Sequence, residues 1–151
     1  MIYTDHAVKF TVRIVDGVWS YEPTQTDGAT VTASGGVVVP VGSGSWAISY
    51  DMQSAVHELF FLMVNTNTAQ VGALTDFDQV IGVETNSGCQ NPQKKVENEK
   101  EVNVYSSNVT VYFRNTDPEG RPVGISFELW ARTVDGLHLL ISRDPQVKNE
   151  N

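Results

Sequence analysis

The sequence contains a single cysteine, Cys89, among 151 residues. A lone cysteine excludes an intrachain disulfide, so the fold must be stabilised without one. Basic residues are also scarce: 10 Lys and Arg stand against 18 Asp and Glu, and the formal net charge is −8. Nucleic acids and anionic membrane surfaces attract basic patches, so this balance argues against both as partners.

Long apolar runs and a basic leader are lacking as well. The longest apolar run, Leu59–Val64, is far too short to cross a bilayer. The first residues, Met1–His6, hold no basic region followed by an apolar one, so we identify no secretory signal. These features predict a soluble, cytoplasmic protein that has no membrane partner.

Signals for metals and cofactors are missing too. The histidines His6, His57 and His138 have no metal-ligand spacing relative to one another or to Cys89. The stretch Gly42–Ser45 is a flexible turn rather than a phosphate-binding loop. No serine stands in a G-x-S-x-G context. We therefore predict neither a metal site nor a cofactor.

The composition favours strands. Hydrophobic residues make up 40% of the chain and charged residues only 19%, while Thr, Ser, Asn, Gly and Val are plentiful. The length suits one domain with a sizeable core. Eight or so short apolar stretches alternate with turn signals. This pattern predicts an all-β chain, an antiparallel β-sandwich rather than a barrel, with residues 1–151 as a single domain.

Alternation of apolar and polar residues marks the individual strands. The clearest covers Val8–Ile14, and Asp16–Gly17 predicts a hairpin turn into Val18–Tyr21. Glu22–Pro23 ends that strand, because proline cannot donate to a ladder. Further strands are expected over Ala29–Ala33, Val37–Val41, Trp46–Tyr50, Val102–Tyr105 and Val109–Phe113.

Two stretches are harder to interpret. His57–Val64 fits either a short helix or a buried strand, and its length and aromatic content favour a central strand covered on both faces. Glu84–Glu101 is polar, densely charged and has almost nothing to bury. We expect this segment to form an exposed loop insertion.

The C-terminal part of the sequence predicts a second hairpin. Val123–Arg132 and Leu137–Pro145 alternate on both arms of an Asp135–Gly136 turn, with a polar tail over residues 145–151 behind them. Both faces of this hairpin are apolar, and a two-layer sandwich covers only one of them. The surplus face suggests a homo-oligomer interface.

The register of this hairpin directs attention to one carboxyl group. With a two-residue turn, Leu129 pairs with Ser142 and Phe127 pairs with Asp144. Residues directly opposed share a face, so Asp144 lies on the apolar face of Phe127 and Leu129. Poor solvation there raises the pKa of the Asp144 carboxyl. Ser142 shares that face and is placed to hydrogen-bond it.

Asp144 precedes Pro145, and Asp-Pro is the most acid-labile kind of peptide bond. The aspartyl carboxyl can attack its own carbonyl carbon, and the basic proline nitrogen is a good leaving group. Attack by a water that a second carboxylate activates is the alternative. Either route releases Pro145–Asn151. A common dipeptide that simply ends a strand is the plainer interpretation, as for Asp117–Pro118 in its polar turn.

Segments at the two ends of the sequence carry a family resemblance. They are Phe10–Ile14, Tyr21–Thr24, Ile125–Leu129, Asp135–Gly136 and Ser142–Asn149. In these segments the chain resembles the DP-EP family of marine bacteria. The resemblance implies a β-sandwich that cleaves itself at a C-terminal Asp-Pro bond, in the manner of an aspartic peptidase. That bond is Asp144–Pro145 here, with Asp144 as the central carboxyl.

Three functional hypotheses stay open. The first is self-processing at Asp144–Pro145. The second is a non-catalytic binding or assembly module that forms a homo-oligomer through the outer face of the last hairpin. The third, carbohydrate binding, depends on Trp19, Trp46 and Trp130, which are better explained as core residues.

Overall fold

The computed structural model describes residues 4–40, 42–54, 56–66, 80–87, 93–115, 123–133, 139–141 and 146–150. Within these ranges every regular element is a β-strand, so the all-β prediction is confirmed. No helix in this part of the chain is long and apolar enough to span a membrane.

The first sheet has the strand order β2-β1-β5-β9-β7, with β8 paired to β9. Its strands are β1 (His6–Val15), β2 (Val18–Gln25), β5 (Gly44–Ser54), β7 (Val80–Ser87), β8 (Gln93–Glu97) and β9 (Lys100–Asn115). The β1–β2 hairpin turns at Asp16–Gly17, where both residues have positive φ, 52° and 77°. That geometry matches the twist of a two-residue hairpin, so the predicted turn is confirmed.

The second sheet has the order β11-β10-β12-β4-β3, with β6 on the other edge of β10. Its strands are β3 (Thr30–Val31), β4 (Val37–Pro40), β6 (His57–Thr66), β10 (Val123–Thr133), β11 (Leu139–Ile141) and β12 (Gln146–Glu150). His57–Val64, whose sequence fitted either a strand or a helix, therefore lies in strand β6. Two pairs are parallel, β1 with β5 and β12 with β4, whereas the sequence predicted antiparallel pairing throughout.

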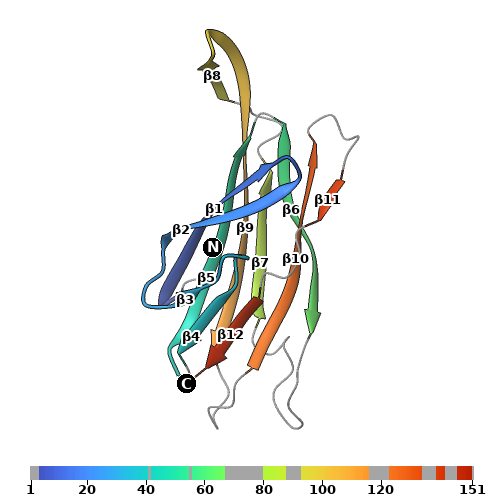
Figure 1. The fold of residues 1–151 in the computed structure, drawn as a ribbon. Coiled ribbons are helices and arrows are strands. Elements are labelled where there is room, and N and C mark those ends of the chain that lie inside the picture. The colour runs from blue at the N-terminus through green and yellow to red at the C-terminus, as the bar shows by residue number, and fades with distance from the viewer. Residues whose placement is uncertain are drawn as a thin grey trace.

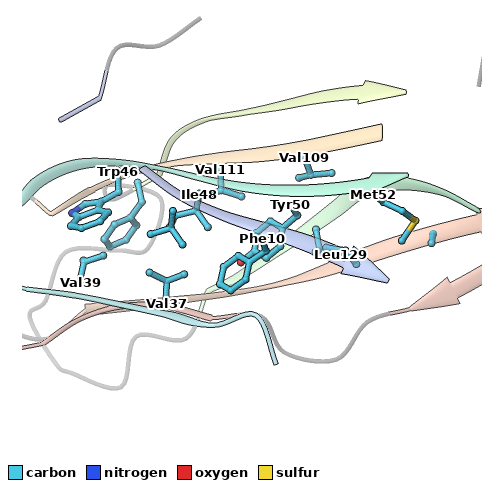
Figure 2. Close-up of a cluster of buried hydrophobic side chains, with 14 residues drawn as sticks. Phe10, Val37, Val39, Trp46, Ile48, Tyr50, Met52, Val109, Val111 and Leu129 are labelled. Carbon is cyan, nitrogen blue, oxygen red and sulfur yellow. The ribbon is translucent and has the colours of Figure 1, made fainter. Parts of the chain in front are cut away.

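The hydrophobic core lies between the two sheets (Figure 2). The first sheet contributes the inward side chains of β1, β5 and β9, and the second contributes those of β4 and β10. The largest fully buried side chains are Trp46, Tyr50, Phe10, Phe113, Ile48, Met52, Leu129 and Val8. Burying a side chain of this size stabilises the fold by about 1.5–3 kcal/mol. The alternation read from the sequence therefore sets which face of each strand meets the core.

The expectation of a loop over Glu84–Glu101 is wrong for much of that segment. Residues 84–87 belong to β7, and β8 pairs antiparallel with the start of β9 around a turn at Asn98–Glu99. This hairpin extends beyond the other strands (Figure 1). The side chains whose burial is described around this turn, at positions 94, 96 and 98–101, are exposed, and Val96 is 71% exposed. Backbone pairing, rather than side-chain burial, holds the segment in strand form.

The prediction of a polar tail over residues 145–151 is also wrong in its structural part. Gln146–Glu150 forms strand β12, which pairs antiparallel with β10 and parallel with β4. The strand is thus an interior strand of the second sheet rather than an appendage (Figure 1). Strand β2 likewise continues past Glu22–Pro23 to Gln25. Proline is tolerated there because β2 is an edge strand.

Gly35 joins the β3–β4 connection to the core. Its carbonyl oxygen accepts a 2.7 Å hydrogen bond from the buried Tyr50 hydroxyl. Burial raises the pKa of Tyr50 well above its ordinary value, so the phenol stays protonated and can donate. Gly35 has a φ of 82°, and a Cβ there would lie 2.7 Å from the Tyr21 ring. Only glycine fits this contact without strain.

A carboxylate holds the start of β1. The Asp27 side chain accepts a 2.8 Å hydrogen bond from the Ala7 backbone N–H and a 3.0 Å bond from the Gln25 amide nitrogen. These two bonds, the backbone one first, lower the pKa of Asp27 from its ordinary value of 3.8. Because the folded state favours the ionised form, this contribution to stability is present above pH 3.8.

We expect Gly35→Ala to lower the free energy of unfolding by about 2–4 kcal/mol, through left-handed strain and the clash with Tyr21. Gly28→Ala is the matched control. Gly28 has a φ of 89° but nothing within 4 Å of its Cβ position, so strain alone should cost about 1–2 kcal/mol. Urea denaturation measures both, and equal losses would contradict the packing argument.

We expect Asp27→Asn to flatten the acid end of the stability profile. The contribution of the carboxylate disappears as the pH falls through its folded pKa, below 3.8. On acidification below about pH 4, the melting temperature of the variant should therefore fall by less than that of the wild type. Glu99→Gln removes one charge from the exposed β8–β9 turn and controls for net charge. Parallel profiles for wild type and Asp27→Asn would refute the assignment.

Candidate functional site

Strand β10 organises the region that the sequence singles out. One edge of β10 pairs along its length with β6, from Ile125 opposite Thr66 to Thr133 opposite His57. The other edge pairs first with β12 and then with β11. Both strands that flank the Asp144–Pro145 bond in the sequence are therefore hydrogen-bonded to the same strand.

The predicted register of the last hairpin is confirmed where the structure describes it. Trp130 pairs with Ile141 and Arg132 with Leu139, as a two-residue turn at 135–136 requires. The register differs on the β12 side, where Ser126 pairs with Gln146. Three residues of β10 separate Trp130 from Ser126, but four residues separate their partners. A one-residue shift exchanges the two faces of a strand, and the hairpin register is therefore not kept as far as Gln146.

The predicted catalytic residues Ser142, Asp144 and Pro145 lie outside the described residues, as do Cys89 and His138. Asp117, the carboxyl of the second Asp-Pro dipeptide, also lies outside them. The structure thus gives the two anchor points of the bond, at Ile141 and Gln146, rather than the geometry of the bond itself.

The apolar face predicted for β10 meets the core. Leu129 and Ala131 are fully buried, and Leu140 of β11 packs against the same cluster. On alternate positions of β10, Trp130 is half-buried and Arg132 is exposed. The strand next to the Asp144–Pro145 bond is therefore anchored through one face, and its other face carries a partly exposed tryptophan.

Trp46 and Trp19 have structural contacts. Trp46 is only 1% exposed, and its indole nitrogen donates a 2.9 Å hydrogen bond to the Ser43 hydroxyl. Its ring also lies 4.5 Å from the ring of His6, centroid to centroid. Trp19 packs against the core cluster. Two of the three rings invoked for carbohydrate binding thus serve the core, as the sequence favoured.

A serine–histidine pair, Ser54 at the end of β5 and His57 at the start of β6, was not anticipated. Ser54 Oγ lies 3.3 Å from His57 Nδ1 and accepts hydrogen bonds from the backbone N–H groups of Val56, at 3.1 Å, and His57, at 3.0 Å. Burial lowers the pKa of the His57 imidazole. The two amides occupy both lone pairs of the hydroxyl oxygen, so it has none left for attack. This pair is a structural turn rather than a nucleophile.

The outer face of the first sheet carries a polar network that sequence reasoning also missed. The Asn108 amide nitrogen donates to Asp51, while its oxygen accepts a 2.7 Å bond from the Thr110 hydroxyl. Thr110 also lies 3.0 Å from Ser49 Oγ. These residues sit on β5 and β9, whose strand pairing the sequence does not specify. Within the described ranges no group of three His, Cys, Asp or Glu residues could hold a metal ion.

A second contact on the same face joins β9 to β7. The Tyr112 hydroxyl donates a 2.8 Å hydrogen bond to the Glu84 carboxylate. Tyr112 is only 5% exposed although it alternates with the core residues Val111 and Phe113. Because each of these polar groups is already engaged, the network reads as cross-strand stabilisation rather than as a ligand site.

We expect Lys148→Pro to destabilise the protein by about 2 kcal/mol or more, because β12 is paired along both edges and proline removes a backbone donor. The matched control is Gln146→Pro, at the first position of the same strand, where proline is tolerated. Chemical denaturation would compare them. Equal unfolding midpoints for the two variants would contradict an interior position for β12.

In comparisons with known proteins, no family model matches this chain and no curated protein matches it.

Proposed function

We propose that this chain cleaves its own Asp144–Pro145 bond, with Asp144 as the reacting carboxyl. The observation that supports the proposal is the attachment of both flanking strands to β10, at Ile141 and at Gln146. Attachment to one strand limits how far Ile141 and Gln146 can move relative to each other. Restriction of this kind removes much of the entropic cost of an intramolecular attack.

The chemistry of the proposal needs no external reagent except water. A carboxyl oxygen of Asp144 attacks its own main-chain carbonyl carbon and forms a five-membered ring. The C–N bond to Pro145 then breaks, and the proline nitrogen leaves with a proton as a secondary amine. Water opens the resulting cyclic anhydride and restores the Asp144 side chain with a new α-carboxyl group. Because the leaving nitrogen must gain a proton, we expect cleavage to quicken at mildly acidic pH.

Ser142 is assigned a positioning role, as a hydroxyl that orients the Asp144 carboxyl. A water molecule activated by a second carboxylate is the alternative to direct attack, and the proposal leaves the choice between them to experiment. The activity is the one that resemblance to the DP-EP family implies, and that resemblance depends on short segments at the two ends of the sequence.

Intact-mass spectrometry tests the proposal directly. Purified protein incubated at mildly acidic pH should lose the mass of Pro145–Asn151 when it is denatured before measurement. Asp144→Asn should abolish this loss, because a neutral amide is a far weaker nucleophile than a carboxylate. Ser142→Ala should slow cleavage without abolishing it.

The chain provides its own control. Asp117→Asn alters the other Asp-Pro dipeptide, and we expect this variant to release Pro145–Asn151 at the wild-type rate. Cleavage at both Asp-Pro bonds at similar rates would indicate ordinary acid lability and would refute the proposal. A chain that stays intact would favour the alternative, a non-catalytic assembly module that forms a homo-oligomer.

A further inference from the structure

In this structure β12 fills a slot between β4 (Val37–Pro40) and the first residues of β10 (Val123–Ser126). We propose that this slot is a strand-binding site, and that copies of this protein exchange their β12 strands through it. The inference rests on the proposed function, because exchange becomes simple once the Asp144–Pro145 bond is cut. Strand β12 then keeps its place through backbone pairing with β10 and β4 rather than through a covalent link (Figure 1).

The β10 wall of the slot is held without help from β12. Along its opposite edge β10 pairs with β6 over the same residues, Ile125 and Ser126, that face β12. Farther along, its buried residues Leu129 and Ala131 lie in the core. Loss of β12 would therefore expose one edge of β10 without removing what fixes the strand.

The β4 wall is held independently as well. Val37 and Val39 are buried in the core, where Figure 2 draws them opposite the side chains of the first sheet. Just before β4, the Gly35 carbonyl accepts the hydrogen bond of the Tyr50 hydroxyl. The β3–β4 pair also adds a hydrogen-bonded neighbour on the far edge of β4. Both walls thus stay in position around an emptied slot.

An emptied slot presents two unpaired strand edges that face each other. Each edge carries backbone N–H and C=O groups that need partners, and an extended strand can satisfy both edges at once. The occupant must run antiparallel to β10 and parallel to β4, as β12 does. Every copy of the protein carries a segment of the required sequence, so a second copy is the partner that fits.

The slot also distinguishes between strands. Val147 is level with the buried Val37 and with Ile125 of β10, and Asn149 is level with the buried Val39. Between them, Lys148 is level with Val38, which is half-buried. A strand with a proline in place of Val147 would leave neighbouring backbone groups unpaired and should be rejected.

Isotope mixing tests the exchange with the whole protein. Uniformly 15N-labelled and unlabelled protein are allowed to cleave, mixed in equal amounts, incubated and purified by gel filtration. Native mass spectrometry should then find hybrids that join a heavy body to a light Pro145–Asn151 peptide, and the reverse. Denatured samples report separately whether cleavage took place.

Synthetic peptides provide the matched control. An excess of the peptide Pro-Gln-Val-Lys-Asn-Glu-Asn should replace the resident strand, whereas the same peptide with Val147→Pro should be at least about tenfold less effective. Cleaved protein that never forms hybrids, or that accepts both peptides equally, would overturn the inference.

A further variant distinguishes failure of the strand-binding site from failure of self-cleavage. If the chain stays intact, a variant with a site-specific protease sequence inserted between Arg143 and Asp144 supplies the cut. Hybrids formed by the nicked variant would uphold the strand-binding site although the proposed self-cleavage had failed. A nicked variant whose peptide is lost, or never exchanges, would refute the site on its own.

Discussion

The second sheet depends on backbone pairing along both edges of one short strand. Strand β12 is the only hydrogen-bonded link, among the described strands, between the β3–β4 pair and β10. Interior strands leave no backbone group to water, so each buried peptide unit must find a partner in the neighbouring strands. The core valines of β4 and the core residues of β10 therefore belong to one continuous sheet because β12 lies between them.

This arrangement connects the fold with the proposed function at one place. The bond proposed to break lies immediately before the strand that completes the sheet. Cutting a chain next to an interior strand need not unfold it, since pairing and core packing remain. The proposed chemistry would thus convert a covalent link into a noncovalent one while preserving the architecture.

Much of the fold could be predicted, and the successes share a physical cause. Alternation identified β1, β5 and β10 because one face of each strand is buried in a core of apolar side chains. Asp16–Gly17 identified its turn because both residues tolerate positive φ. The register of β10 with β11 followed from counting outward from a two-residue turn, and the described pairs agree with it.

The features of the fold that the sequence did not predict also share a cause. Strands β8 and β12 have no clean apolar alternation, and their pairing comes from backbone groups that every sequence carries. Glu99 adopts a φ of 63° in the β8–β9 turn, a position for which glycine or asparagine is the usual signal. For the site, the sequence identified the strand that anchors the bond. The one-residue difference in register between the β11 and β12 pairings of β10 carries no sequence signal.

The parallel pairing of β4 with β12 has a consequence for folding during synthesis on the ribosome. Strand β4 can pair with β12 only after Val147 has been synthesised, about 110 residues later than its partner Val37. An unpaired β-edge next to apolar side chains is the kind of surface that promotes aggregation. Strongly non-local contacts of this sort also slow folding, so pairing of β12 with β4 should be among the late steps in forming the sheet.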